Sequence, residues 1–126
     1  MSTRTRAILL SVVLGGAGLL WLGVPAPLTA QEQAPTRRDF TVTARKFAFS
    51  PNRIEVHQGD IVRVTVEAED IAHSFTVDDY RIAKRAAPGQ PVTFEFRADQ
   101  AGTFPFYCNL KLDDGCSRMR GELVVR

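Results

Sequence analysis

The residues best suited to chemistry in this chain are two cysteines and a methionine close together near the C-terminus. Cys108, Cys116 and Met119 lie between two strand-like runs, so one loop could bring their three sulfur atoms together. Thiolate and thioether ligands select copper over hard cations. His73 begins another strand-like run and could add an imidazole from a second loop. A His and Cys site with a weak Met is typical of electron-transfer copper proteins, so these four residues predict a copper site.

The remaining polar candidates fit this site less well. His57 lies beside the turn sequence 58–60, at the other end of the strand-like run 61–66 from His73. At about 3.3 Å per residue, that run alone separates the two histidines by roughly 20 Å, so we expect His57 at the surface. The sequence Asp-Asp-Gly at 113–115 is more typical of a turn than of an acidic metal site.

Short runs of alternating apolar and polar residues fill the chain from Phe40 onward. In the runs 61–66 and 91–97, valines and phenylalanines alternate with polar residues, which is typical of half-buried strands. The predicted strands are 40–47, 53–57, 61–66, 73–77, 91–97, 103–108 and 121–125. Several short strands without a long amphipathic helix predict an all-β fold, a Greek-key β-sandwich of two antiparallel sheets.

The N-terminus has the pattern of an export signal. Arg4 and Arg6 precede an apolar run at 7–24, and cleavage after Ala30 would leave a mature chain that begins at Gln31. The apolar run is at the lower limit of what spans a bilayer, so a retained membrane anchor is the alternative. Either outcome makes the domain periplasmic or otherwise extracytoplasmic. The predicted organisation is a signal peptide or anchor at 1–30, a linker at 31–39 and a β-domain at 40–126.

The charge of the chain gives no sign of a nucleic-acid partner. The net charge of +2 comes from Arg4 and Arg6, and the acidic and basic residues after the leader balance. Nucleic-acid binding needs a clustered basic face, which scattered charges do not form.

A disulfide between Cys108 and Cys116 is the alternative to metal binding. An exported chain with two cysteines ordinarily pairs them. Closing this loop would stabilise the fold by roughly 2.5 kcal/mol through loss of chain entropy in the unfolded state. Reversible passage between disulfide and metal site is a third alternative, because the same proximity serves both.

The region from about residue 40 to 126 resembles the cupredoxins, most closely the copper-binding domain of cytochrome oxidase subunit II. In that family a His follows an early strand, as His73 does in DIAHSF, and an aromatic-Tyr-Cys run such as FYC at 106–108 ends a late strand. A second His, two residues and then Met close the family's ligand loop; here Cys116 stands in the place of that His, and Met119 keeps the place of the Met. The spacing of Cys108 and Cys116 is wider than in the dinuclear copper A motif. The resemblance therefore implies a cupredoxin fold with an atypical ligand loop.

Three functions follow from these residues. The resemblance implies mononuclear copper electron transfer with a redox partner. A second thiolate makes the site softer, which favours a Cu(I) carrier or sensor with a copper-delivery partner. The third hypothesis is a metal-free β-sandwich interaction domain with a Cys108–Cys116 disulfide.

We do not expect this chain to be an enzyme. Copper oxidases and nitrite reductases need additional His-rich copper centres, which two histidines cannot supply. His73 and Ser74 are adjacent, and adjacent strand residues point to opposite faces, so they do not suggest a nucleophile triad.

Overall fold

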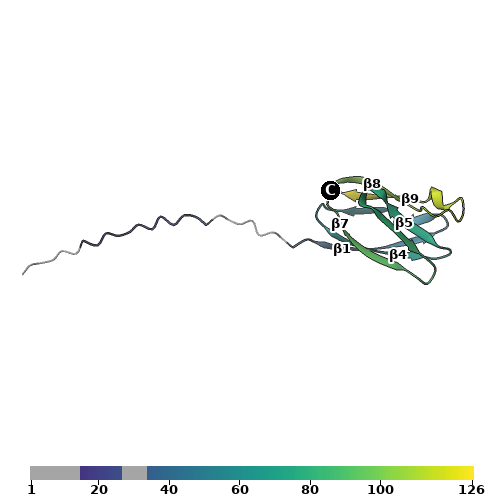
Figure 1. Ribbon diagram of the computed structural model, residues 1–126, viewed down its shortest axis with the longest axis horizontal. Helices are drawn as coiled ribbons and strands as arrows, with labels where there is room; N and C mark the ends of the chain where they lie inside the picture. The colour runs from purple at the N-terminus through teal and green to yellow at the C-terminus, as the bar shows by residue number, and fades with distance from the viewer. Residues whose placement is uncertain (1–14, 27–33) are drawn as a thin grey trace, which may run out of the picture. The chain divides into compact units, whose positions relative to one another are not determined.

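The structure, a computed structural model, describes residues 15–26 and 34–126 of the chain (Figure 1). The chain divides into two units, residues 1–32 and 33–126. Residues 15–26 have neither helix nor strand, and no helix among the described residues is long and apolar enough to cross a membrane. The other part of the predicted signal or anchor run, 7–14, and the predicted cleavage position after Ala30 lie outside the described residues.

Residues 34–126 form nine strands and two short 3-10 helices. In chain order they are β1 (Arg37–Arg45), β2 (Ala48–Ser50), β3 (Arg53–Val56), β4 (Ile61–Ala68), β5 (His73–Val77), η1 (Asp78–Tyr80), β6 (Ile82–Ala86), β7 (Val92–Arg97), β8 (Gly102–Tyr107), η2 (Cys116–Arg118) and β9 (Arg120–Val125). Each predicted strand overlaps one of these elements.

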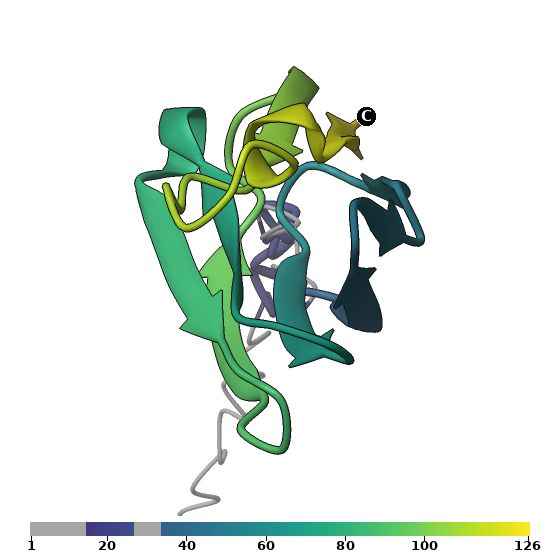
Figure 2. The same cartoon turned by 90° about the vertical axis from the view of Figure 1, so that its right-hand side faces the viewer.

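The strands form two sheets, which confirms the predicted β-sandwich (Figures 1 and 2). One sheet has the order β2-β1-β4-β7 and the other has the order β3-β9-β8-β5-β6. The expectation of purely antiparallel sheets is wrong, because β1 pairs in parallel with β4 and β3 pairs in parallel with β9. The chain leaves the first sheet after β2, adds β3 to the second sheet and returns beside β1. This crossover lets β4 run in the same direction as β1.

The core lies between the two sheets. Val62, Val64 and Val66 of β4 are buried as their alternation predicts. Fully burying one such side chain contributes about 1.5 to 3 kcal/mol. Around them pack the aromatic rings of the core, with Phe75 and Phe106 of neighbouring strands at a centroid distance of 4.6 Å. These contacts make a rigid frame for the ends of β5 and β8.

Two strands and one boundary differ from the sequence-based expectation. β1 begins at Arg37 instead of Phe40, so it includes residues expected in a linker. β2 and β6 were not expected. β6 is the edge strand of its sheet and exposes Ala83, Lys84 and Arg85 in succession, so its sequence has no period-two alternation. Charged side chains on an edge strand oppose edge-to-edge aggregation, which explains this composition.

Candidate metal centre

The four predicted ligands lie at one end of the sandwich. His73 is the first residue of β5, and Cys108 directly follows β8, which pairs antiparallel with β5. Cys116 begins η2, and Met119 lies between η2 and the start of β9, which runs antiparallel to β8. Because β5 and β9 both run antiparallel to β8, the start of β5, the end of β8 and the start of β9 lie at the same end of this sheet. All four side chains are buried, with exposed fractions of 2% or less.

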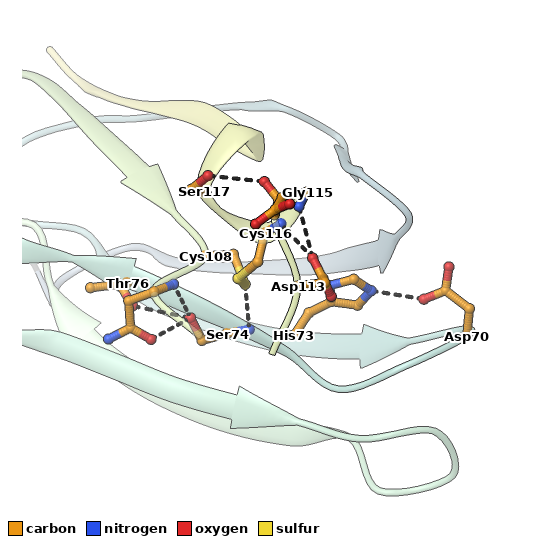
Figure 3. Close-up of a disulfide and its surroundings, with 11 residues drawn as sticks. Asp70, His73, Ser74, Thr76, Cys108, Asp113, Gly115, Cys116 and Ser117 are labelled. Carbon is orange, nitrogen blue, oxygen red and sulfur yellow. Dashed lines mark hydrogen bonds and ion pairs between the residues drawn. A yellow bond between two sulfur atoms is a disulfide. The ribbon is translucent and has the colours of Figure 1, made fainter. Parts of the chain in front are cut away.

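Cys108 and Cys116 are joined by a disulfide bond (Figure 3). Their Cα atoms are 5.2 Å apart, which lies in the ordinary range for disulfides. The structure thus describes the disulfide alternative inferred from the sequence. Sulfur atoms bonded to each other are not thiolates, and across residues 15–26 and 34–126 no three His, Cys, Asp or Glu side chains are grouped as a metal site.

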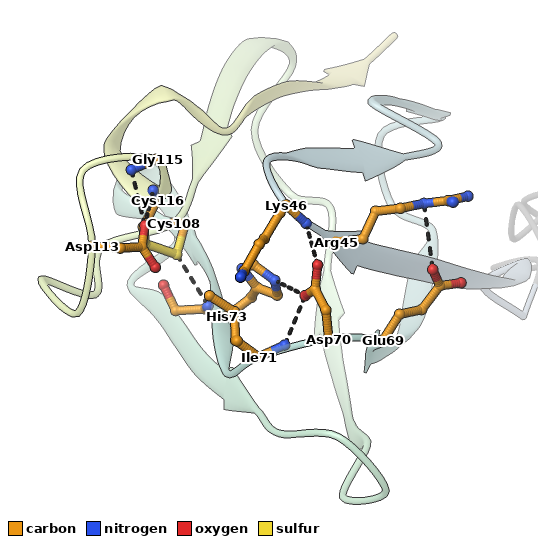
Figure 4. Close-up of polar contacts among 11 residues, drawn as sticks. Arg45, Lys46, Glu69, Asp70, Ile71, His73, Cys108, Asp113, Gly115 and Cys116 are labelled. Atoms are coloured by element: carbon orange, nitrogen blue, oxygen red, sulfur yellow. Dashed lines mark hydrogen bonds and ion pairs between the residues drawn. A yellow bond between two sulfur atoms is a disulfide. The ribbon is translucent and has the colours of Figure 1, made fainter.

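His73 is held by one ring nitrogen. Its Nε2 lies 2.7 Å from Oδ1 of Asp70 (Figure 4). Its Nδ1 is buried and has no hydrogen-bond partner among the described residues. A buried polar atom without a partner is uncommon in folded proteins and is one sign of a functional site.

Asp70 is itself fixed by backbone hydrogen bonds. Its Oδ2 accepts a hydrogen bond of 2.6 Å from the N–H of Lys46, and its Oδ1 accepts one of 2.7 Å from the N–H of Ile71. Burial of the carboxyl opposes its ionisation, but the bonds from Lys46, His73 and Ile71 outweigh this effect and lower the pKa of Asp70 to about 2. Asp70 is therefore a carboxylate at neutral pH and can only accept hydrogen bonds.

A second set of hydrogen bonds positions Cys108. The N–H of Ser74 lies 3.4 Å from Cys108 Sγ and donates to it. Ser74 Oγ donates to Asn109 Oδ1 at 2.7 Å and accepts from the N–H of Asn109 at 2.7 Å. These bonds tie the start of β5 to the chain after β8. Asp70 and Asn109 were not predicted from the sequence; their nearness to His73 and Cys108 along the chain was the available signal.

The Asp-Asp-Gly segment forms the expected turn. Asp113 Oδ1 accepts hydrogen bonds of 2.9 Å from the N–H groups of both Gly115 and Cys116. A Cβ atom on Gly115 would overlap the ring of Phe47, so this contact favours glycine. The loop is therefore held by its own turn and by Phe47, which contacts it from the segment between β1 and β2.

The outer face of the site combines polar and apolar groups. Tyr107 is half-buried, and its hydroxyl donates to Asp78 at 2.9 Å. This hydrogen bond, with some burial and the charge of Asp78, raises the pKa of Tyr107. Leu112 lies in the loop between β8 and β9, here called the ligand loop, and has 66% of its surface exposed. A shallow hollow of about 290 Å³ next to Cys108 is lined by Tyr107, Cys108, Asn109, Leu110, Lys111, Ser117 and Arg120.

His57 lies apart from the site, as expected. It is exposed and its backbone N–H donates to Asp60 Oδ2 at 2.9 Å. It precedes β4, whereas His73 follows that strand. The two histidines therefore belong to opposite ends of β4.

The donor set at this end fits copper when both sulfur atoms are thiols. His73 would offer Nδ1, Cys108 and Cys116 would offer thiolates, and Met119 would offer a thioether. This set is soft, and it contains one imidazole. In the disulfide state, two of the four donors are bonded to each other.

Known proteins with similar sequences include subunits of cytochrome c oxidase. The chain is 29% identical over 102 residues to a cytochrome c oxidase subunit 2 of Thermus thermophilus, covering 81% of this chain and 75% of the relative. A second subunit 2 sequence of Thermus thermophilus is also 29% identical over 102 residues, and the chain spans 60% of its length. The chain therefore corresponds to a part of these subunits.

Solved structures share the fold at low sequence identity. The periplasmic domain of cytochrome oxidase subunit II (CoxB) of Bradyrhizobium japonicum has a TM-score of 0.63 at 18% identity, covering 70% of this chain and 83% of that domain. Subunit II in a mixed disulfide with thioredoxin-like TlpA has a TM-score of 0.60 at 18% identity, with coverages of 70% and 80%. Auracyanin A, a blue copper protein of Chloroflexus aurantiacus, has a TM-score of 0.58 at 16% identity, with coverages of 71% and 99%.

The sequence profile of the family described as "Cupredoxin-like domain" matches residues 15–125. This match covers most of the chain, and the two-sheet fold agrees with it. The chain therefore belongs to the family of cupredoxin-like domains and is related to the copper domain of cytochrome c oxidase subunit II.

Proposed function

We propose that this protein is an exported copper-binding cupredoxin that transfers electrons through one copper ion held by His73, Cys108, Cys116 and Met119. The observation that carries the proposal is the buried Nδ1 of His73, which has no hydrogen-bond partner in residues 15–26 and 34–126. It lies at the same end of the sandwich as three sulfur side chains. A buried acceptor without a partner costs about 1 to 3 kcal/mol, and metal ligation would offset this cost.

The copper ion would supply a one-electron couple, and the residues of the chain would hold it in a fixed, dry environment. His73 and Cys108 are kept in place by Asp70 and Ser74. Both ligands extend from the ends of packed strands, so little rearrangement would accompany a change of charge. Burial of the four side chains excludes water from the ligands.

Copper binding in this proposal requires reduction of the disulfide. Two electrons and two protons convert the disulfide into two thiols, which then lose their protons on binding copper. The relative solved in a mixed disulfide with a thioredoxin-like protein supports a redox partner of that kind. We propose that the hollow next to Cys108 and the exposed Leu112 are where such a partner approaches.

A Cu(I) carrier or sensor is the second candidate, and the second cysteine favours it. Cys116 stands where the resemblance predicts an imidazole, and two thiolates make the site softer and more negative. A reversible visible charge-transfer band would support electron transfer. Colourless, tightly held Cu(I) without such a band would support carriage.

A metal-free interaction domain is the third candidate, and the disulfide favours it. The Cys108–Cys116 bond closes the loop that would otherwise hold copper. Its expected contribution to stability is roughly 2.5 kcal/mol. In this reading Met119 only fills space in the core.

We further propose that the chain is not an enzyme by itself and that it acts outside the cytoplasm. His57 and His73 belong to opposite ends of β4, which argues against a second, His-rich copper centre. The N-terminal export pattern and the periplasmic location of the CoxB domain support an extracytoplasmic protein. A redox or copper-delivery protein would be its partner.

The test is metal analysis combined with a count of free thiols on the exported protein. We expect about one copper per chain when both thiols are reduced, and no copper in the disulfide form. Cys108→Ser should abolish copper binding, whereas His57→Ala should leave it intact, with circular dichroism to verify folding of both variants. Equal loss in both variants, or no copper in the reduced wild-type chain, would contradict the proposal.

A further inference from the structure

We propose that Asp70 is a positioning residue that fixes the side chain of His73 as its Nε2–H tautomer and thereby keeps Nδ1 as a free acceptor. This inference rests on the proposed copper site, but it makes a separate statement about the metal-free protein. Nothing in the sequence motif requires it, because either ring nitrogen of a histidine can carry the proton.

The His73 ring faces Asp70 with one nitrogen and leaves the other without a partner. Figures 3 and 4 both show the His73 ring between the disulfide and Asp70, with Nε2 turned toward Asp70. The Nε2 to Oδ1 distance of 2.7 Å is that of a strong hydrogen bond to a carboxylate. The other nitrogen, Nδ1, is buried and has no partner among the described residues.

Asp70 cannot donate a hydrogen bond to His73. Both of its oxygen atoms accept hydrogen bonds from backbone N–H groups, Oδ2 from Lys46 and Oδ1 from Ile71. A carboxylate offers only lone pairs, so the ring atom facing it must be a donor. The Nδ1–H tautomer would place a lone pair of Nε2 against Oδ1 and leave a buried N–H without an acceptor. We expect it to be disfavoured by roughly tenfold or more.

The tautomer of His73 decides which ring nitrogen can bind a metal. A ligating nitrogen must present a lone pair, and a hydrogen bond from the other ring nitrogen orients the ring and fixes the tautomer. Removal of such a partner typically lowers metal affinity by about 10-fold to 100-fold. Asp70 would therefore act on copper only through His73.

The experiment compares the full-length wild type with Asp70→Asn, Asp70→Ala and Glu69→Gln. Asparagine nearly preserves the shape of Asp70 but has one acceptor oxygen for three donors, so its amide would turn an NH₂ group toward either His73 or Lys46. Glu69→Gln is the matched control, because it makes the same change of charge at the neighbouring residue. Glu69 pairs with Arg45 at 3.4 Å. The chemical shifts of the His73 ring nitrogens in the metal-free chain measure the tautomer. Competition with a chromophoric chelator measures the Cu(I) affinity of the reduced chain.

We expect a single Nε2–H tautomer in the wild type and in Glu69→Gln, and its loss in Asp70→Ala; Asp70→Asn should keep it only if the amide oxygen still faces His73. Cu(I) affinity should fall by about 10-fold to 100-fold in Asp70→Ala and stay unchanged in Glu69→Gln. A wild-type ring protonated at Nδ1 would overturn the inference without any variant, as would an unchanged tautomer in Asp70→Ala. A changed tautomer with unchanged Cu(I) affinity would overturn the role of Asp70 in metal binding. Failure of the reduced wild type to bind Cu(I) would instead contradict the proposed function, while the ring-nitrogen shifts would still test the tautomer.

Discussion

At the scale of single residues, the chemistry of this domain depends on Cys116. It stands where the cupredoxin resemblance predicts an imidazole, and its sulfur is bonded to Cys108. An imidazole at this position could not form that bond. With Cys116 the chain can form a disulfide with Cys108, as the structure describes, and reduction of this bond would give a pair of thiols. In the proposed copper site, this change of one residue would couple metal binding to the redox state of the chain.

We expect Cys116→His to rebuild a set of two histidines, one cysteine and one methionine. Imidazole is neutral and accommodates both oxidation states, so the variant should bind Cu(II) better and acquire a blue-copper absorption band. Visible spectroscopy after addition of Cu(II) checks this. Cys116→Ser is the control, since it also breaks the disulfide but adds no imidazole and should lack the band. If Cys116→His only loses about 2.5 kcal/mol of stability and gains no band, Cys116 is a structural disulfide partner and the copper proposal should be withdrawn.

At the scale of elements, the ligand loop is held in place by contacts from outside its own sheet. Phe47 lies between β1 and β2, yet its ring packs directly on Gly115 in the loop between β8 and β9. The guanidinium of Arg118 lies 5.8 Å from the same ring. Asp113 completes the arrangement by bonding the N–H groups at the start of η2. The position of Cys116 thus depends on the first sheet as well as on its own loop.

We expect Gly115→Ala to destabilise the domain by about 1 to 3 kcal/mol, because the added methyl group would overlap the ring of Phe47. Denaturant unfolding of the disulfide form measures this. The backbone of Gly115 has φ of −80°, which alanine adopts readily, so the loss should come from the overlap. Phe47→Leu should therefore relieve most of the cost in the double variant.

Lys111→Ala, at an exposed position of the same loop, should change stability by no more than about 0.5 kcal/mol. Equal losses with and without Phe47→Leu would show that the contact is not the cause.

At the scale of the whole molecule, the chain is one β-domain preceded by a separate N-terminal unit. Residues 33–126 contain the strands of both sheets and all the residues of the candidate site. The core between the sheets is built from side chains within the same range. We therefore expect the domain to fold without residues 1–32.

We expect a chain that begins at Gln31 to fold with the same thermal midpoint as the full-length protein. N-terminal sequencing of the exported protein should find the mature end near Gln31, because a basic stretch followed by an apolar run predicts an export signal cleaved after Ala30. Cell fractionation is the accompanying measurement. Recovery of the protein only from membranes, with residues 1–30 still attached, would favour the anchor instead.

Much of the fold was predictable because alternation along a strand is a local property. The valines at positions 62, 64 and 66 face the core because successive side chains in a strand point to opposite sides. The parallel pairing of β1 with β4 was not predictable in this way, since it depends on how the chain crosses between the sheets. The edge strand β6 was missed because its exposed middle residues lack alternation.

For the candidate site, the sequence by itself determined the donor types and the two loops that carry them. It did not determine whether the sulfur atoms of Cys108 and Cys116 are thiols or a disulfide, because a spacing that suits two metal ligands also suits a disulfide. Only the folded loop brings the Cα atoms of the two cysteines to 5.2 Å. The exposure of His57 was predictable from the sequence, because this residue lies beside the turn at 58–60 that precedes β4. The partnership of Asp70 with His73 required the tertiary structure, since the carboxylate is held by the N–H of Lys46 from a distant segment. Local patterns set which side chains face inward, whereas contacts between distant segments decide which of them meet and in what chemical state.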